Sequence, residues 1–95
     1  SNKNSFPIKL HFNFKQTVTS FNVTKKTSIK NIRQWIQKNE DIQQNQQIVL
    51  IYSGKIMHNE DITGQYKIKE NSIIDVIIRD DSKIDALIKS LISSN

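Results

Sequence analysis

The 95-residue chain contains no cysteine, one proline and two glycines, and it has no long hydrophobic run. The absence of cysteine excludes disulfides, thiolate metal sites and cysteine nucleophiles, and it is compatible with any redox compartment. The longest apolar runs are Ile48–Tyr52 and Ile73–Ile78, the second of which has Asp75 inside it. Both are far shorter than the roughly 18 residues that a membrane-spanning helix needs, so we expect no transmembrane segment.

The length predicts a single domain, because domains usually hold roughly 100 to 200 residues. A core of this size leaves little room for a large cofactor, and we expect neither a cofactor nor a small-molecule substrate. The chain begins with Ser1 rather than methionine, and its start lacks the apolar segment of a secretory signal. We therefore expect a processed chain or a piece of a longer protein.

Acidic residues are missing from the first part of the chain, where the first one is Glu40. The whole chain carries 14 Lys and Arg against 9 Asp and Glu, a formal net charge of +5. Such a balance can attract phosphate backbones or acidic proteins. Apart from the adjacent Lys25 and Lys26, however, the lysines are scattered singly, and no aromatic residues alternate with arginine as they do in nucleic-acid-binding motifs. We therefore expect a solvated basic surface and no nucleic-acid partner.

Two strands and a helix are predicted in the first half of the chain. Apolar and polar residues alternate over Ile8–Asn13 and again over Thr19–Thr24, and the short polar break between them is typical of an antiparallel hairpin. Ser28 can cap a helix whose apolar positions have helical spacing, namely Ile29, Ile32 and Ile36. Trp35 lies at the edge of this stripe, where it either shields the rim of the core or anchors a partner.

Three further strands are predicted in the second half. Ile48–Tyr52 is β-branched and aromatic, and Gly54 can supply the positive φ of the turn that follows it. The amide-rich run before this strand, Gln43–Gln47, is expected to be a loop. A very short strand is expected at Lys55–Met57, and the last strand at Ile73–Ile78.

This order of elements predicts an α+β fold in which a mixed sheet packs on one helix. A single helix covers only one face of such a sheet. Ile51 and Ile77 are out of phase with the inward positions of their strands, so they are expected on the uncovered face. Apolar side chains on an uncovered face form a candidate protein-binding surface.

A second, amphipathic helix is predicted over residues 81–95. Its apolar residues are spaced i, i+3, i+4 and i+7, and they are Ile84, Leu87, Ile88 and Leu91. A helix this short is not stable alone in water. We therefore expect it to dock on its own domain, on a partner or a second copy, or on a membrane surface.

Catalytic and metal-binding constellations are missing from the sequence. His11 and His58 have no second histidine at metal-ligand spacing, and no serine lies in a nucleophile-elbow pattern. A glycine-rich phosphate loop is also absent. The chain is therefore predicted to hold no metal and not to be an enzyme.

The chain resembles the ubiquitin-like domains from Ile8 to about Arg79. Beside the order of elements, the resemblance rests on short motifs: Gln46-Gln47, Leu50-Ile51-Tyr52-Ser53-Gly54-Lys55, Asp61-Ile62-Thr63 with Tyr66 and Ile68, and Ser72-Ile73-Ile74-Asp75-Val76. The second motif looks most similar to the ubiquitin-like domains at the front of proteasome shuttle and quality-control proteins. The resemblance implies a β-grasp fold, with a tail at residues 1–7, the ubiquitin-like domain at 8–80 and a helix at 81–95.

The resemblance also implies that the uncovered sheet face is a recognition surface. Its hydrophobic patch consists of Val49, Ile51 and Ile77, and its rim of Gly54, Lys55 and Asp75. Val49 enlarges this patch, because ubiquitin carries a basic residue at the matching place. Ubiquitin also has an apolar residue in its first hairpin loop, for which no counterpart is expected in the short Lys15-Gln16 turn.

Conjugated members of the family need a tail that ends in Gly-Gly, and this sequence has no glycine after Gly64. The resemblance therefore implies a non-conjugated module that docks proteasome receptors or ubiquitin-binding proteins, in the cytoplasm or nucleus. One alternative is a structural subunit of a large assembly, anchored by its C-terminal helix and Trp35. Another is a modifier whose mature tail is produced elsewhere. In each case Tyr66 is structural, because it matches a tyrosine whose hydroxyl pins the nearby loop.

Overall fold

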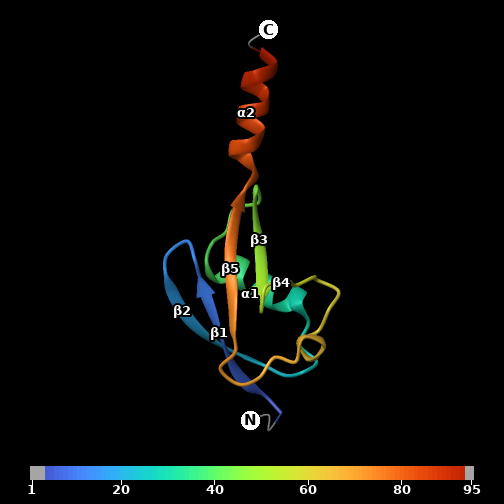
Figure 1. The fold of residues 1–95 in the computed structure, drawn as a ribbon. Helices are drawn as coiled ribbons and strands as arrows, with labels where there is room; N and C mark the ends of the chain where they lie inside the picture. Colours follow the sequence, from blue (N-terminus) through green and yellow to red (C-terminus); the bar gives the residue numbers. More distant parts are fainter. Residues whose placement is uncertain (1–3, 94–95) are drawn as a thin grey trace.

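A computed structural model describes the backbone of residues 4–93 and their side chains except at positions 81–85. Five strands and one helix form the body of the molecule, and a second helix extends from it (Figure 1). In chain order the elements are β1 (Phe6–Phe12), β2 (Thr17–Val23), α1 (Ile29–Asn39), β3 (Gln46–Tyr52), β4 (Lys55–Ile56), the 3-10 turn η1 (Thr63–Tyr66), β5 (Ile73–Asp80) and α2 (Asp81–Ser93).

The five strands form one mixed sheet in the order β2-β1-β5-β3-β4. β1 runs parallel to β5, while β1 and β2, β3 and β5, and β3 and β4 pair antiparallel. The first and last strands therefore lie side by side at the centre of the sheet. The predicted α+β class, a mixed sheet packed on one helix, is confirmed.

Helix α1 packs across one face of this sheet and lies behind it in Figure 1. Its start is capped by Ser28, whose Oγ accepts the backbone N–H of Asn31 at 3.0 Å. The three apolar positions of its stripe, Ile29, Ile32 and Ile36, are completely buried. The other buried hydrophobic residues come from the strands and the two loops beside them: Ile8, Leu10, Phe12, Val23, Ile48, Leu50, Met57, Ile68, Ile74 and Val76.

Strand β3 begins two residues earlier than its apolar run does. Gln46 and Gln47, expected to belong to a loop, pair with Asp80 and Arg79 of β5. β5 also continues beyond Ile78, to Asp80, so the two strands pair over a longer stretch than their apolar runs predict. Polar residues can occupy these paired positions because they lie at the end of the sheet, away from the core.

The first hairpin turn differs from the expectation that it lacks an apolar residue. The turn begins at Asn13, so it includes Phe14, whose side chain is 47% exposed. The Phe14 ring meets the edge of the buried Phe12 ring, with 5.7 Å between the centroids. The prediction was wrong because it counted only Lys15 and Gln16 as the loop, whereas the turn covers residues 13–16.

Helix α2 continues directly from β5 and points away from the body of the molecule (Figure 1). The molecule measures 61 × 23 × 21 Å and has a radius of gyration of 16.0 Å. A compact chain of this length would have a radius of about 12 Å, and the projecting helix accounts for the difference. No helix in the described part of the chain has the length and apolar character needed to cross a bilayer.

The Ser28 cap provides a test of what holds α1 in place. Changing Ser28 to Ala removes the acceptor for the Asn31 N–H and should lower the free energy of unfolding by about 1 kcal/mol. Urea unfolding followed by circular dichroism measures the change. A Ser28→Asp variant, which restores an acceptor, serves as the control and should unfold near the wild-type midpoint.

Candidate functional site

The sheet face opposite α1 carries a group of apolar side chains on neighbouring strands. Val49 of β3 is the register partner of Ile77 of β5, and Ile51 is the partner of Asp75. Val49, Ile51 and Ile77 alternate with buried residues of the same strands, so they point away from the helix, and each is half-buried. The structure thus brings together on one surface the three residues of the patch expected from the sequence.

The tight turn after β3 adds a fourth apolar residue to this face. Ser53 and Gly54 form a two-residue loop that joins β3 to β4. Both residues have the positive φ that such a tight turn needs, 52° and 77°. This loop pairs Ile51 with Ile56. Register partners share a face, so Ile56, which is 58% exposed, lies beside Ile51. We call Val49, Ile51, Ile56 and Ile77 the apolar patch.

Ile56 was not among the site residues expected from the sequence. The signal that identifies it is the combination of Gly54 with a two-residue turn, which fixes the register of the short strand. Lys55 pairs with Tyr52 in the same turn and is exposed. Gly54 and Lys55 therefore lie at the end of the patch formed by the turn.

Asp75 lies in the middle of the sheet, at the border of the apolar patch. Its Oδ1 accepts a hydrogen bond from Nδ1 of His11 at 3.0 Å, across the parallel β1 and β5 pair. His11 and Asp75 are register partners, and His11 also pairs with Val18 of β2. The pair therefore borders the apolar patch on its β1 side and separates it from the exposed Val18. No third potential metal ligand lies with this pair in the described part of the chain.

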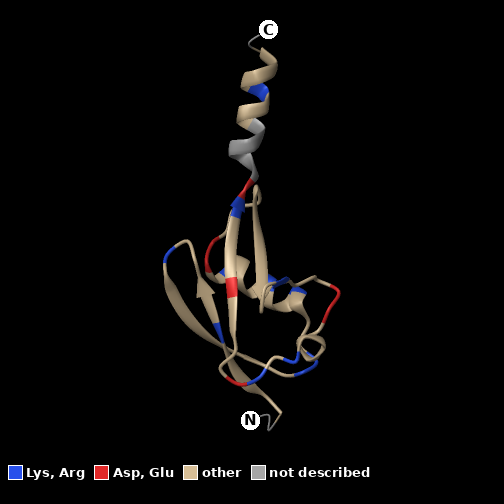
Figure 2. Cartoon of the chain, in the orientation of Figure 1, with Lys and Arg blue, Asp and Glu red and all other residues tan. Residues whose placement is uncertain are grey.

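Few charged side chains lie near the apolar patch. Figure 2 shows most charges in loops and toward strand ends, apart from an acidic position in the middle of β5, which is Asp75, and β3 carries no charged residue. An apolar surface bordered by polar groups is typical of a protein-binding site.

The loop that follows β4 is held by Tyr66. The Tyr66 hydroxyl donates a hydrogen bond to Oδ2 of Asp61 and accepts one from the backbone N–H of His58 at 3.3 Å. Burial raises the pKa of Tyr66 above its ordinary value of 10.0, and the hydrogen bond to Asp61 raises it further. The hydroxyl thus connects both ends of the loop from His58 to Asp61.

The residues expected to form a second interaction region are dispersed. Trp35 is half-buried and packs on Phe21, with 4.9 Å between the ring centroids. The apolar stripe of α2 is exposed to solvent. Its side chains are between 48% and 68% exposed, and they are Leu87, Ile88, Leu91 and Ile92. The side chain of Ile84 lies outside the described residues. Helix α2 points away from the body of the molecule, so Trp35 and this stripe do not form one surface.

Comparison with known families decides the classification. A family model described as Ubiquitin family matches residues 8–81 of the chain. The chain belongs to the ubiquitin family. None of the curated proteins compared matches it. The architecture of this ubiquitin-like domain is accordingly the β-grasp, and domains of this kind are generally non-catalytic. The closer resemblance to the domains of proteasome shuttle proteins stays a prediction.

The hydrogen bonds of Tyr66 lead to a pH-dependent prediction. Changing Tyr66 to Phe removes both bonds and should lower the free energy of unfolding by about 1 kcal/mol at neutral pH. Because folding raises the pKa of Tyr66, its contribution is fully present below about pH 10 and is lost as the pH rises through the folded-state pKa.

Urea unfolding of both proteins at neutral pH and above about pH 10 measures this difference. The gap between wild type and variant should narrow at the higher pH. Changing Tyr52, which is also half-buried, to Phe is the control. An equal gap at both pH values would contradict the assignment of the raised pKa to Tyr66.

Proposed function

We propose that this ubiquitin-like domain is a non-conjugated interaction module that docks partner proteins reversibly through the apolar patch. The observation that carries the proposal is the location of Val49, Ile51, Ile56 and Ile77 on the sheet face opposite α1. The exposed part of these side chains gains stability only when another surface covers it.

The size of the patch supports modest affinity. Complete burial of an aliphatic side chain contributes about 1.5–3 kcal/mol, and these four side chains are already partly buried. Covering the remainder yields about 3–6 kcal/mol, to which the polar groups at the border add specificity. After the cost of association, this corresponds to dissociation constants in roughly the micromolar range or weaker. Binding of this strength exchanges readily.

The class of partner follows from the family resemblance. The Leu50–Lys55 motif resembles that of the ubiquitin-like domains in proteasome shuttle and quality-control proteins. By this resemblance, the expected partners are proteasome receptors or other ubiquitin-binding proteins. The absence of conjugation is supported by the region after β5, which forms α2 and contains no glycine.

An Ile51→Ala variant tests the role of the patch. It should weaken binding to purified proteasome ubiquitin receptors or isolated ubiquitin-binding domains about tenfold or more, because Ile51 contacts both neighbouring strands of the patch. Titration by isothermal calorimetry measures the change. Ile73→Ala is the matched control, since Ile73 is 54% exposed on the same face of β5 but pairs with Lys9, outside the patch.

The two possible failures of this test are distinguishable. Binding that is unchanged in Ile51→Ala would show that the patch is not the docking surface. Unfolding of Ile51→Ala, seen in its amide spectrum, would show that Ile51 is needed for the core. In that case Ile56→Ser, which changes a more exposed patch residue, carries the test.

A second candidate function rests on α2. Four aliphatic side chains of this helix are exposed, and the helix makes its main contact with the rest of the chain at β3. An isolated helix of this length is marginal in water, so α2 gains stability from packing against another surface. This observation supports the alternative of a structural subunit that is anchored in an assembly by its C-terminal helix.

The double variant Leu87→Ser, Leu91→Ser separates this candidate from the first. If α2 anchors the protein, the variant should lose its stoichiometric partners in purification from native lysate, while Ile51→Ala keeps them. The matched control is Ala86→Ser, Lys89→Ser, which places two serines on the other side of the same helix. Equal retention by both double variants would exclude α2 as the anchor.

A further inference from the structure

The edge of β3 is only partly covered by its neighbour. β4 pairs with the last two residues of β3, Ile51 and Tyr52, and in the described part of the chain no strand lies beside Gln46–Val49 on that side. The carbonyl of Leu50 accepts the N–H of Met57 at 2.8 Å, so the backbone groups of Leu50 point to this edge. Alternate residues of a strand point to the same neighbour, and the N–H and C=O of Ile48 therefore also face the open edge.

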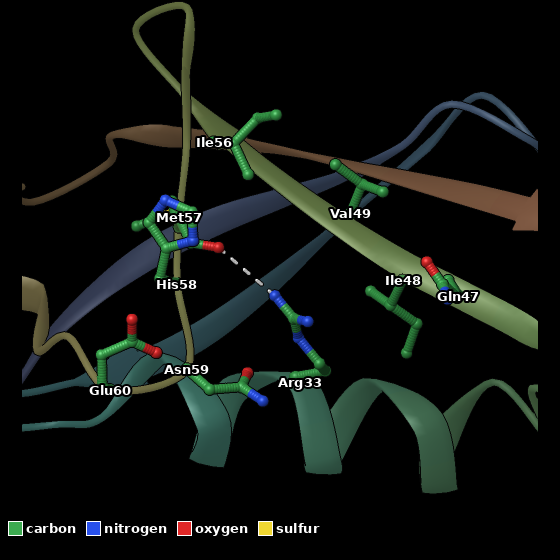
Figure 3. A pocket seen from close by; sticks show the side chains of 9 residues that line it. All are labelled: Arg33, Gln47, Ile48, Val49, Ile56, Met57, His58, Asn59 and Glu60. Atoms are coloured by element: carbon green, nitrogen blue, oxygen red, sulfur yellow. Dashed lines mark hydrogen bonds between the residues drawn. The ribbon is translucent and has the colours of Figure 1, made fainter.

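Two hollows follow this open edge. The first, of about 310 Å³, lies between Gln47–Val49 and the segment 56–60 that leaves β4. The second, of about 270 Å³, lies between the start of β3 and the polar residues Gln37 and Gln44. Both are lined by Arg33, Gln47 and Ile48, so together they run along β3 on either side of Arg33. Figure 3 shows the first hollow, bounded by α1, β3 and the segment around His58.

Arg33 reaches from α1 into this region (Figure 3). Its Nη2 donates to the carbonyl of Met57 at 3.4 Å, a long hydrogen bond. Its Nε is buried and has no hydrogen-bond partner among the described residues. Burial lowers the pKa of Arg33 from its ordinary value, which reflects the loss of water around the guanidinium. The site therefore holds a positive charge with one buried donor, Nε, that the described part of the chain does not satisfy.

A carboxylate is the group that satisfies such an arginine best, because it accepts two parallel hydrogen bonds from the guanidinium fork. The one acidic residue that lines the first hollow, Glu60, makes no ion pair with Arg33. It lies on the segment facing α1, next to Asn59 (Figure 3). The second hollow is lined by no acidic residue.

We propose that the open edge of β3 adds an extended segment of a partner protein in which acidic and apolar residues alternate. Main-chain hydrogen bonds to Ile48 hold the added strand, as in other cases of strand addition. Its side chains alternate between the two faces of the sheet. Acidic residues on the α1 face meet Arg33, and apolar residues on the opposite face lie beside Val49 and Ile56. This site is supported by the unpaired backbone edge of β3 and the side chain of Arg33. The site does not depend on the docking role of the apolar patch.

The test uses a capped seven-residue peptide of alternating valine and aspartate, titrated into the isotopically labelled full chain. We expect saturable NMR shifts of the Ile48 and Leu50 amides and of the Arg33 Nε–H. A peptide with lysine in place of aspartate should not bind. A peptide with the same side chains but with every backbone nitrogen methylated keeps the charge but cannot pair as a strand, and it should not bind either.

Variants of Arg33 complete the test. Arg33→Gln should weaken binding of the valine–aspartate peptide about tenfold or more. Lys38→Gln, which removes the same charge from an exposed position of α1, should leave it unchanged. Arg33→Met should also lose peptide binding, yet its midpoint of urea unfolding should equal or exceed that of wild type, because it removes a buried donor without a partner.

Three results would overturn the proposal. Equal binding of the methylated peptide would show charge attraction without strand addition. A clear loss of stability in Arg33→Met would show that the arginine is a structural residue. Concentration-dependent shifts of the same amides without peptide would show that a second copy of the chain occupies the edge.

Discussion

The packing of α1 on a single face of the sheet is the contact on which the rest of the structure depends. Ile29, Ile32 and Ile36 are fully buried, and each strand that meets them presents every second side chain to the helix. This contact decides which residues of β3 and β5 form the core. It also leaves the alternate residues on a face that the helix cannot reach, so the apolar patch is a direct result of how the core is built.

Local patterns predicted much of the fold and part of the candidate site. Strand alternation placed Ile51 and Ile77 opposite the helix, and helical spacing identified the buried stripe of α1. Features that depend on pairing between distant segments were beyond such patterns. The bond between His11 and Asp75 joins residues 64 positions apart through the parallel pairing of β1 and β5. Ile56 needed the register of the turn, and the turn position of Phe14 needed the true end of β1.

Two surfaces of different chemistry meet at β3. The outward face of the strand carries apolar side chains and offers hydrophobic contact without directional demands. Its edge offers backbone hydrogen bonds beside the guanidinium of Arg33, which demand a partner of defined direction and charge. The open edge arises because β4 is only two residues long and leaves most of β3 unpaired on one side. The two sites proposed for this domain therefore use the face and the edge of the same strand.

The direct passage of β5 into α2 has a mechanical consequence. The described chain begins near β1 and ends in α2, at opposite ends of the molecule (Figure 1). Because β1 and β5 are parallel neighbours, a pull applied to both ends acts along the two strands and loads their hydrogen bonds together in shear. Bonds loaded together resist far more force than bonds that open one after another. A pull between the two ends of the described chain is therefore opposed by the β1–β5 hydrogen bonds acting together.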